Sequence, residues 1–265
     1  MSLTKYFDSP LFQPQPIDLL HHDRSNLSSD DWNLLSNIIH AYDEQKLVIQ
    51  TQHLLHKQAS LPLKLRSKQN FTLELIGSFY SAVEPLVKRT DLFRQCPAGI
   101  RRVIIQNNTA GVGSFTATLA AIEANVYDSE AHIHVCNEIY GPEYVAESYR
   151  VMQRFDSNRT LVKMMVLVLA FGSNSSIVTF NCLPVNSSVL HSIYLIRIQD
   201  LLITVLWKYL VHQYGWSGAV KHFNILVKNF LDTLTRMEEN QSQAHWQMVD
   251  NIVNHMNHTL LGRDL

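Results

Sequence analysis

Apolar residues recur at intervals of three and four along most of the chain after residue 26, which is the spacing of one face of an α-helix. The first such segment follows Leu27. Here Ser28 and Asp31 have the spacing of a capping box, and Leu27 and Trp32 have that of a hydrophobic staple. We therefore expect a long amphipathic helix to begin at this point, continued by Leu35, Ile38, Ile39 and Tyr42.

Prolines interrupt residues 1–26, which show no periodicity, so this segment is expected to form a flexible N-terminal tail. Residues 27–265 are expected to form one domain, since their number is within the usual range for a single core.

Similar patterns predict several further helices. The basic stretch 57–68, which Pro62 interrupts, is expected to be a connector. Pro85 is expected to kink its helix, and Gly113 either weakens the long central helix or permits close packing against it. The predicted helices cover residues 71–89, 100–128, 143–171, 189–214, 219–237 and 246–260.

Residues 131–145 are the best candidate for a small β-hairpin, because Ile133 and Val135 alternate with polar residues before a turn signal at Gly141. In a strand, His132, His134 and Cys136 would share one face, and imidazole with thiolate can hold zinc. A structural zinc site usually needs a fourth ligand, and no CxxC or HExxH motif supplies one. Exposed histidines on a hairpin are therefore the favoured interpretation over a metal-dependent enzyme, and no metal or other cofactor is expected.

The predicted helix over 189–214 carries a narrow polar stripe on an otherwise apolar surface. It is expected to be largely buried, with the stripe facing solvent. The stripe consists of Arg197, Asp200, Thr204, Lys208 and His212.

Composition limits the classes of function. Hydrophobic residues make up 46% of the chain, enough for a large core, and a net charge of −1 does not favour direct binding to nucleic acid. Three cysteines cannot form a closed disulfide framework and suit a reducing compartment. The most apolar run, residues 161–171, is too short to span a bilayer, so no membrane association is expected. No phosphate-binding loop or nucleophile elbow appears, and the chain is not expected to be an enzyme.

The segment 87–106, VKRTDLFRQCPAGIRRVIIQ, resembles the signature of the nuclear receptor ligand-binding domain. Val87-Lys88 takes the place of an Ala-Lys pair, Phe93 that of the signature Phe, and Ile104-Ile105 that of a Leu-Leu pair. The segment departs from the signature where Cys96 replaces Leu, Ile100 replaces Asp and Arg101 replaces Gln.

The opening LSSDDWNLLSNIIHAYDEQ is similar to the first helix of that family, and Gln199-Asp200 to a pair in its late helices, so the resemblance covers about residues 27–265. It implies an all-α fold, a layered antiparallel helical sandwich of about 10–12 helices with one small β-hairpin. It also implies localisation in the nucleus, or in the nucleus and cytoplasm. The family's DNA-binding module needs two four-cysteine zinc sites, which three cysteines cannot build, so no direct DNA contact by this chain is expected.

The resemblance implies a groove for coregulator helices of the Leu-x-x-Leu-Leu type, in which a lysine holds the C-terminal carbonyls of the peptide. Lys88 matches that lysine, and the alternative is an ordinary solvated lysine near a helix end. The C-terminal LLGRDL falls where an activation helix is expected, but Arg263 stands in the place of its glutamate, so ligand-dependent activation is in doubt. The predicted groove residues are Lys88, Arg101, Arg102, Ile104, Ile105, Leu261, Asp264 and Leu265.

The resemblance also implies an interior pocket for a lipophilic ligand. The same residues can instead simply fill the core. The predicted pocket residues are Ile76, Tyr80, Val83, Phe115, Leu119, Met152 and Met256.

Two functions are therefore kept open. The first is a ligand-regulated or orphan receptor domain that recruits transcriptional coregulators and pairs with itself or another chain through the helices around 190–235. The second is a non-receptor helical scaffold for protein interactions, without a ligand.

Overall fold

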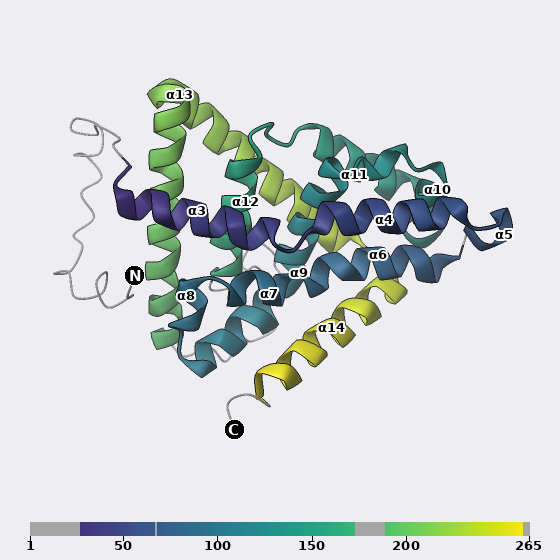
Figure 1. Ribbon diagram of the computed structural model, residues 1–265, viewed down its shortest axis with the longest axis horizontal. Coiled ribbons are helices and arrows are strands. Elements are labelled where there is room, and N and C mark those ends of the chain that lie inside the picture. The colour runs from purple at the N-terminus through teal and green to yellow at the C-terminus, as the bar shows by residue number, and fades with distance from the viewer. Residues whose placement is uncertain (1–26, 67, 173–188, 262–265) are drawn as a thin grey trace.

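The computed structural model describes residues 27–66, 68–172 and 189–261. Every regular element within these ranges is a helix, which confirms the all-α prediction (Figure 1). The elements are α3 (Ser29–Asp43), α4 (Leu47–Ser60), α5 (Leu63–Arg66), α6 (Gln69–Ser81), α7 (Val83–Lys88), α8 (Asp91–Arg94), α9 (Ala98–Glu123), η1 (Val126–Asp128), α10 (Glu130–Tyr140), α11 (Pro142–Gln153), α12 (Arg159–Ala170), α13 (Val189–Glu239) and α14 (Gln243–Leu261).

The predicted β-hairpin is wrong, because residues 131–145 form α10 and the start of α11. Ser129 caps α10 by accepting a hydrogen bond from the backbone N–H of His132. Gly141, at φ 84°, ends that helix, and Pro142 opens the next at a position where its missing N–H costs nothing. The turn signal at Gly141 was real, but it joins two helices.

The start of α3 is as predicted. The Ser28 side chain accepts from the N–H of Asp31 at 3.1 Å, and the Asp31 carboxylate accepts from the N–H of Ser28 at 2.9 Å. Lys208 of α13 also binds this carboxylate, at 3.1 Å. Burial tends to raise the pKa of Asp31, but the hydrogen bonds from Ser28 and the charge of Lys208 outweigh it and lower that pKa. The cap of one helix thus also joins α3 to α13.

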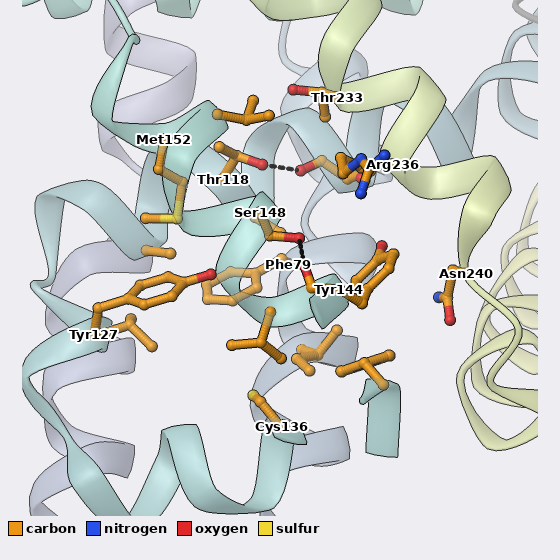
Figure 2. A pocket seen from close by; sticks show the side chains of 18 of the residues that line it. Phe79, Thr118, Tyr127, Cys136, Tyr144, Ser148, Met152, Thr233, Arg236 and Asn240 are labelled. Carbon is orange, nitrogen blue, oxygen red and sulfur yellow. Dashed lines mark hydrogen bonds between the residues drawn. The ribbon is translucent and has the colours of Figure 1, made fainter. Parts of the chain in front are cut away.

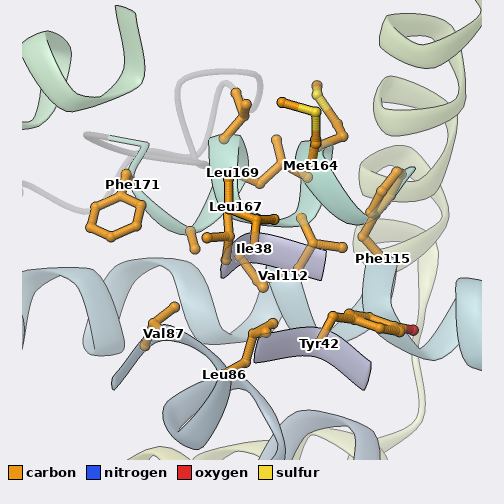
Figure 3. Close-up of a cluster of buried hydrophobic side chains, with 14 of the residues drawn as sticks. Ile38, Tyr42, Leu86, Val87, Val112, Phe115, Met164, Leu167, Leu169 and Phe171 are labelled. Carbon is orange, nitrogen blue, oxygen red and sulfur yellow. The ribbon is translucent and has the colours of Figure 1, made fainter. Parts of the chain in front are cut away.

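The long helix α9 lies at the centre of the molecule and packs against α6, α12, α13 and α14. Gly113 permits close packing, because a Cβ there would overlap the ring of Tyr80 on α6. The main core lies between α9, α3, α7 and α12, where Ile38, Leu86, Val112 and Leu167 are almost fully buried (Figure 3).

Helix α13 bends at Gly215, where φ is 65° and ψ is 177°, so that its two parts diverge (Figure 1). The break at Gly215 is as predicted. Leu202, Leu206 and Leu210 of the first part are buried, while the predicted polar stripe is solvent-facing apart from the half-buried Lys208. Ile196 is also exposed, so this part is less completely buried than expected.

In the parts of the chain that the structure describes, no helix combines the length and the apolar character needed to cross a bilayer.

Candidate functional site

A pocket of about 150 Å³ lies where α6, α9, α10, α11, α13 and the start of α14 converge (Figure 2). Its walls combine apolar side chains with an unusual number of hydroxyl, imidazole and thiol groups. A more voluminous hollow, of about 360 Å³, lies between α3, α8 and α13, but Asn33, Asn37 and Gln95 on its rim are exposed. The first pocket is the better candidate, since the polar side chains Tyr80, His132 and His245 among its lining residues are buried.

Helix α10 supplies one wall of the pocket through His132, Cys136 and Tyr140. These residues are four apart, so the helix places them on one face. His134 lies on another face, with its side chain 62% exposed and its Nε2 3.4 Å from Glu138. His132, His134 and Cys136 therefore do not converge, and the described residues contain no cluster of three or more His, Cys, Asp or Glu able to hold a metal.

His245, near the start of α14, lies between two tyrosine hydroxyls of the pocket wall. Its Nε2 is 3.2 Å from the Tyr80 hydroxyl, and its Nδ1 is 3.0 Å from the Tyr140 hydroxyl. Burial lowers the pKa of His245 to about 4, and it raises the pKa of both tyrosines. All three groups are therefore uncharged at neutral pH.

His132 and Cys136 form a second polar pair, with 3.3 Å between Nε2 and Sγ. Burial lowers the pKa of His132 to about 4 and raises that of Cys136 to about 12, so the pair is a neutral imidazole and a thiol. An activated cysteine needs the opposite shift, toward thiolate. This geometry supports binding rather than nucleophilic chemistry.

Among the residues that line the pocket, within the described chain, His132 Nδ1 is the only buried side-chain nitrogen or oxygen without a hydrogen-bond partner. A buried polar atom in this state costs about 1–3 kcal/mol relative to a satisfied one. This nitrogen is covered on all sides, so the cost is carried within the pocket wall.

The remaining walls carry apolar side chains together with the hydroxyls of Thr118, Ser148 and Thr233, each of which donates to the backbone of its own helix. Phe79 of α6, Ala121 of α9, and Val151 and Met152 of α11 contribute apolar surface (Figure 2). The lining residue Arg236 is ion-paired with Glu239, one turn farther along α13.

Three of the predicted pocket residues, Ile76, Tyr80 and Met152, line the pocket. The other four, Val83, Phe115, Leu119 and Met256, lie in the core and are each at most 2% exposed. Phe115 packs on Phe155 with 5.2 Å between ring centroids. For these four residues the alternative interpretation, simple core filling, holds.

The predicted groove residues do not form one surface. Ile104 and Ile105 are 1% and 0% exposed and belong to the core, so they provide no wall for a surface groove. Lys88 is ion-paired with Glu84 one turn earlier. Arg102 is exposed and Arg101 is half-buried. Leu261 ends α14, whereas Asp264 and Leu265 lie outside the described residues.

Sequence reasoning missed His132, Cys136, Tyr140 and His245 as pocket residues. The first three follow from the four-residue spacing once α10 is known to be a helix. His245 has no comparable signal, since its partners Tyr80 and Tyr140 are 165 and 105 residues away in the sequence.

Neither protein-family models nor curated proteins give a match to this chain. Its function is inferred from the pocket and the surface geometry together with the resemblance described above.

Proposed function

We propose that the chain is a ligand-binding domain of the nuclear receptor type, ligand-regulated or orphan, that binds a lipophilic small molecule and recruits transcriptional coregulators. In this proposal the helices form a layered antiparallel sandwich. The chain acts in the nucleus, or in the nucleus and cytoplasm, as a binding module rather than an enzyme. It contacts neither DNA nor membranes directly. The pocket between α6, α9, α10, α11, α13 and α14 is the observation that carries the proposal.

The pocket supports regulation because α14 closes part of it. His245 of α14 hydrogen-bonds Tyr80 of α6 and Tyr140 of α10. Farther along α14, Met256 contacts Thr109 of α9, with 3.9 Å between Sδ and Oγ1. A ligand that favours this arrangement of α14 would shift its population, and the change would extend along the helix.

Lys88 and Arg102 are the two basic residues that supply the charge for coregulator binding in this proposal. Lys88 is at the end of α7 and Arg102 is in the first turns of α9, which packs against α7. Basic side chains there can hold the C-terminal carbonyls of a Leu-x-x-Leu-Leu helix. The leucines must contact residues other than Ile104 and Ile105, because these are buried.

The test is binding of labelled coactivator and corepressor helix peptides to the purified chain, with and without a lipid extract. We expect saturable binding that Lys88→Glu abolishes, and dependence on the extract. Lys57→Glu is the matched control, because Lys57 is an exposed lysine near the end of another helix, α4. Equal binding by both variants would reject the groove.

The second candidate is a helical interaction scaffold that has no ligand. It is favoured by the apolar side chains exposed on α13 beyond the bend, where Trp216, Val220 and Leu231 are 40–42% exposed. Val220 follows Trp216 by four residues and Leu231 follows Val220 by eleven, so the three side chains follow one face of the helix. If the chain is a scaffold, Lys88→Glu should have no effect on peptide binding. Only substitutions on this face of α13 should abolish binding to a partner protein.

A further inference from the structure

The pocket restricts the class of ligand it can hold more narrowly than the term lipophilic does. We propose that it binds an uncharged molecule of single-ring size that carries one hydroxyl or carbonyl group. The regulatory role of this ligand rests on the proposed function, whereas its chemical class does not. It follows from the pocket volume, the arrangement of polar groups on one wall and the pairing of charges.

Volume sets the size of the ligand. The pocket measures about 150 Å³. Cavities of roughly this volume in other proteins hold benzene, whereas pockets for drug-sized ligands span about 300–1,000 Å³. A molecule with one ring and one small substituent fills a volume of this size.

A row of polar groups follows one wall, whereas the hydroxyls of Thr118, Ser148 and Thr233 on the other walls donate to the backbone of their own helices. His132, Cys136 and Tyr140 follow one face of α10, and His245 joins Tyr140 to Tyr80. Ala121 and Val151 line the pocket from α9 and α11. A ring can therefore lie on carbon surface while its substituent faces the α10 wall.

A count of hydrogens shows what that wall offers. Neutral His245 has one N–H and one bare nitrogen, each within hydrogen-bond distance of a tyrosine hydroxyl. One tyrosine donates to the bare nitrogen, and the other accepts from the N–H and keeps its own hydrogen. When Nδ1 carries the proton, Tyr140 is that second tyrosine, and its O–H can be donated to a ligand oxygen without any change of charge.

Charge is the third restriction. The polar wall consists of neutral groups, and the positive charge of Arg236 is already paired with Glu239. A carboxylate placed here would lose its hydration without gaining a free cation, which is strongly unfavourable. The pocket should therefore discriminate against anions of the same size.

Three probes of one ring size separate these factors. They are p-cresol, which has a hydroxyl, toluene, which has none, and benzoate, which is charged at neutral pH. The measurement is the rise in thermal midpoint of the full chain with probe concentration, which reports binding to the folded state. We expect saturable stabilisation by p-cresol and no effect of benzoate. Toluene should bind about tenfold more weakly than p-cresol, because it lacks one hydrogen bond to a buried group.

Two pairs of variants locate the site. Ala121→Leu fills the pocket and should abolish binding of both neutral probes, whereas Ala146→Leu, at an exposed position of α11, should not. Tyr140→Phe should weaken p-cresol about tenfold and leave toluene unchanged. Tyr149→Phe, at a more exposed tyrosine, should change neither. A structural effect of Tyr140→Phe would alter both probes alike.

The inference is overturned if benzoate binds as well as p-cresol, or if Ala121→Leu leaves the binding of p-cresol intact. Should a lipid extract still promote peptide binding in that case, the proposed function would survive without this ligand class. Conversely, specific binding of p-cresol with no binding of any coregulator peptide would support the inference and reject the proposed function.

Discussion

His245 and His132 are buried beside hydroxyl and thiol groups, and burial lowers the pKa of each to about 4. An unfolded histidine titrates near pH 6.5. Because the folded pKa lies below the unfolded one, the unfolded chain binds more protons between about pH 6.5 and pH 4. The stabilising contribution of these neutral imidazoles is therefore present above this window and is lost as the pH falls through it.

The free energy of unfolding should consequently fall between about pH 7 and pH 5, by on the order of 2 kcal/mol for each histidine. Urea denaturation at the two pH values measures this loss. The double variant His132→Gln/His245→Gln, which has no imidazole to protonate there, should lose much less over the same range. His134→Gln is the control, since His134 is exposed. A wild-type chain equally stable at both pH values would contradict the neutral, buried state of the two rings.

At the scale of elements, the contact between α6 and α9 depends on the absence of a side chain at Gly113. Alanine normally stabilises a helix interior by about 1 kcal/mol relative to glycine. Here, however, the new Cβ would overlap the ring of Tyr80, and displacing that ring would disturb its hydrogen bond to His245. We expect Gly113→Ala to lower the free energy of unfolding by about 1–3 kcal/mol.

Gly99→Ala tests the interpretation of that loss, because Gly99 is an exposed residue in the first turn of the same helix. It should be neutral or slightly stabilising in urea denaturation. Equal effects at the two glycines would mean that helix propensity, and not the contact with Tyr80, decides the stability of α9.

The helices show which parts of the fold the sequence determines locally. The capping box at Ser28 and the break at Gly215 are local signals, and both were predicted correctly. Helix α4 was missed, because its Lys57 and the following Pro62 indicated a connector. Residues 131–145 were assigned to strands because Ile133 and Val135 alternate, although the buried positions 132, 135 and 136 equally fit a helix. A segment this short is compatible with both periods.

The candidate site was predicted only in part, again because periodicity reports local pattern and not contacts between distant segments. Periodicity identifies the inward face of a helix, and it correctly placed Ile76 and Tyr80 inside. It does not distinguish an inward residue that meets another helix from one that meets a pocket. Phe115 meets Phe155 and Phe230, whereas Tyr80 meets Gly113 and His245. That difference depends on residues distant in the sequence.

At the scale of the whole molecule, the exposed apolar face of α13 bears on association. Trp216 and Val220 are about 40% exposed and lie one turn apart after the bend. An apolar face of this kind on a helix commonly marks a protein interface. We expect the chain to self-associate through it, or to require a partner chain there, and Val220→Glu to shift the sedimentation coefficient toward that of the monomer.

Ile49→Glu is the matched control, because Ile49 on α4 is an apolar residue with a greater exposure of 65%. If both substitutions reduce association alike, the effect is one of general surface hydrophobicity, and α13 has no special part in it. If neither does, the face of α13 does not mediate self-association.

The pocket and the coregulator surface, if both operate, must be linked by a single coupling free energy. Linkage requires that the factor by which a ligand raises peptide affinity equals the factor by which the peptide raises ligand affinity. Titrating p-cresol at saturating peptide, and peptide at saturating p-cresol, measures both factors; couplings of about 5–150-fold are typical.

Ala121→Leu occupies the pocket permanently, so peptide affinity in this variant should no longer respond to p-cresol, whereas Ala146→Leu should behave as wild type. Because His245 places α14 in the pocket wall and Met256 places the same helix on α9, α14 is the element that both sites would bias. Peptide affinity that is the same with and without p-cresol would mean that α14 does not transmit occupancy of the pocket, and that any ligand bound there is structural.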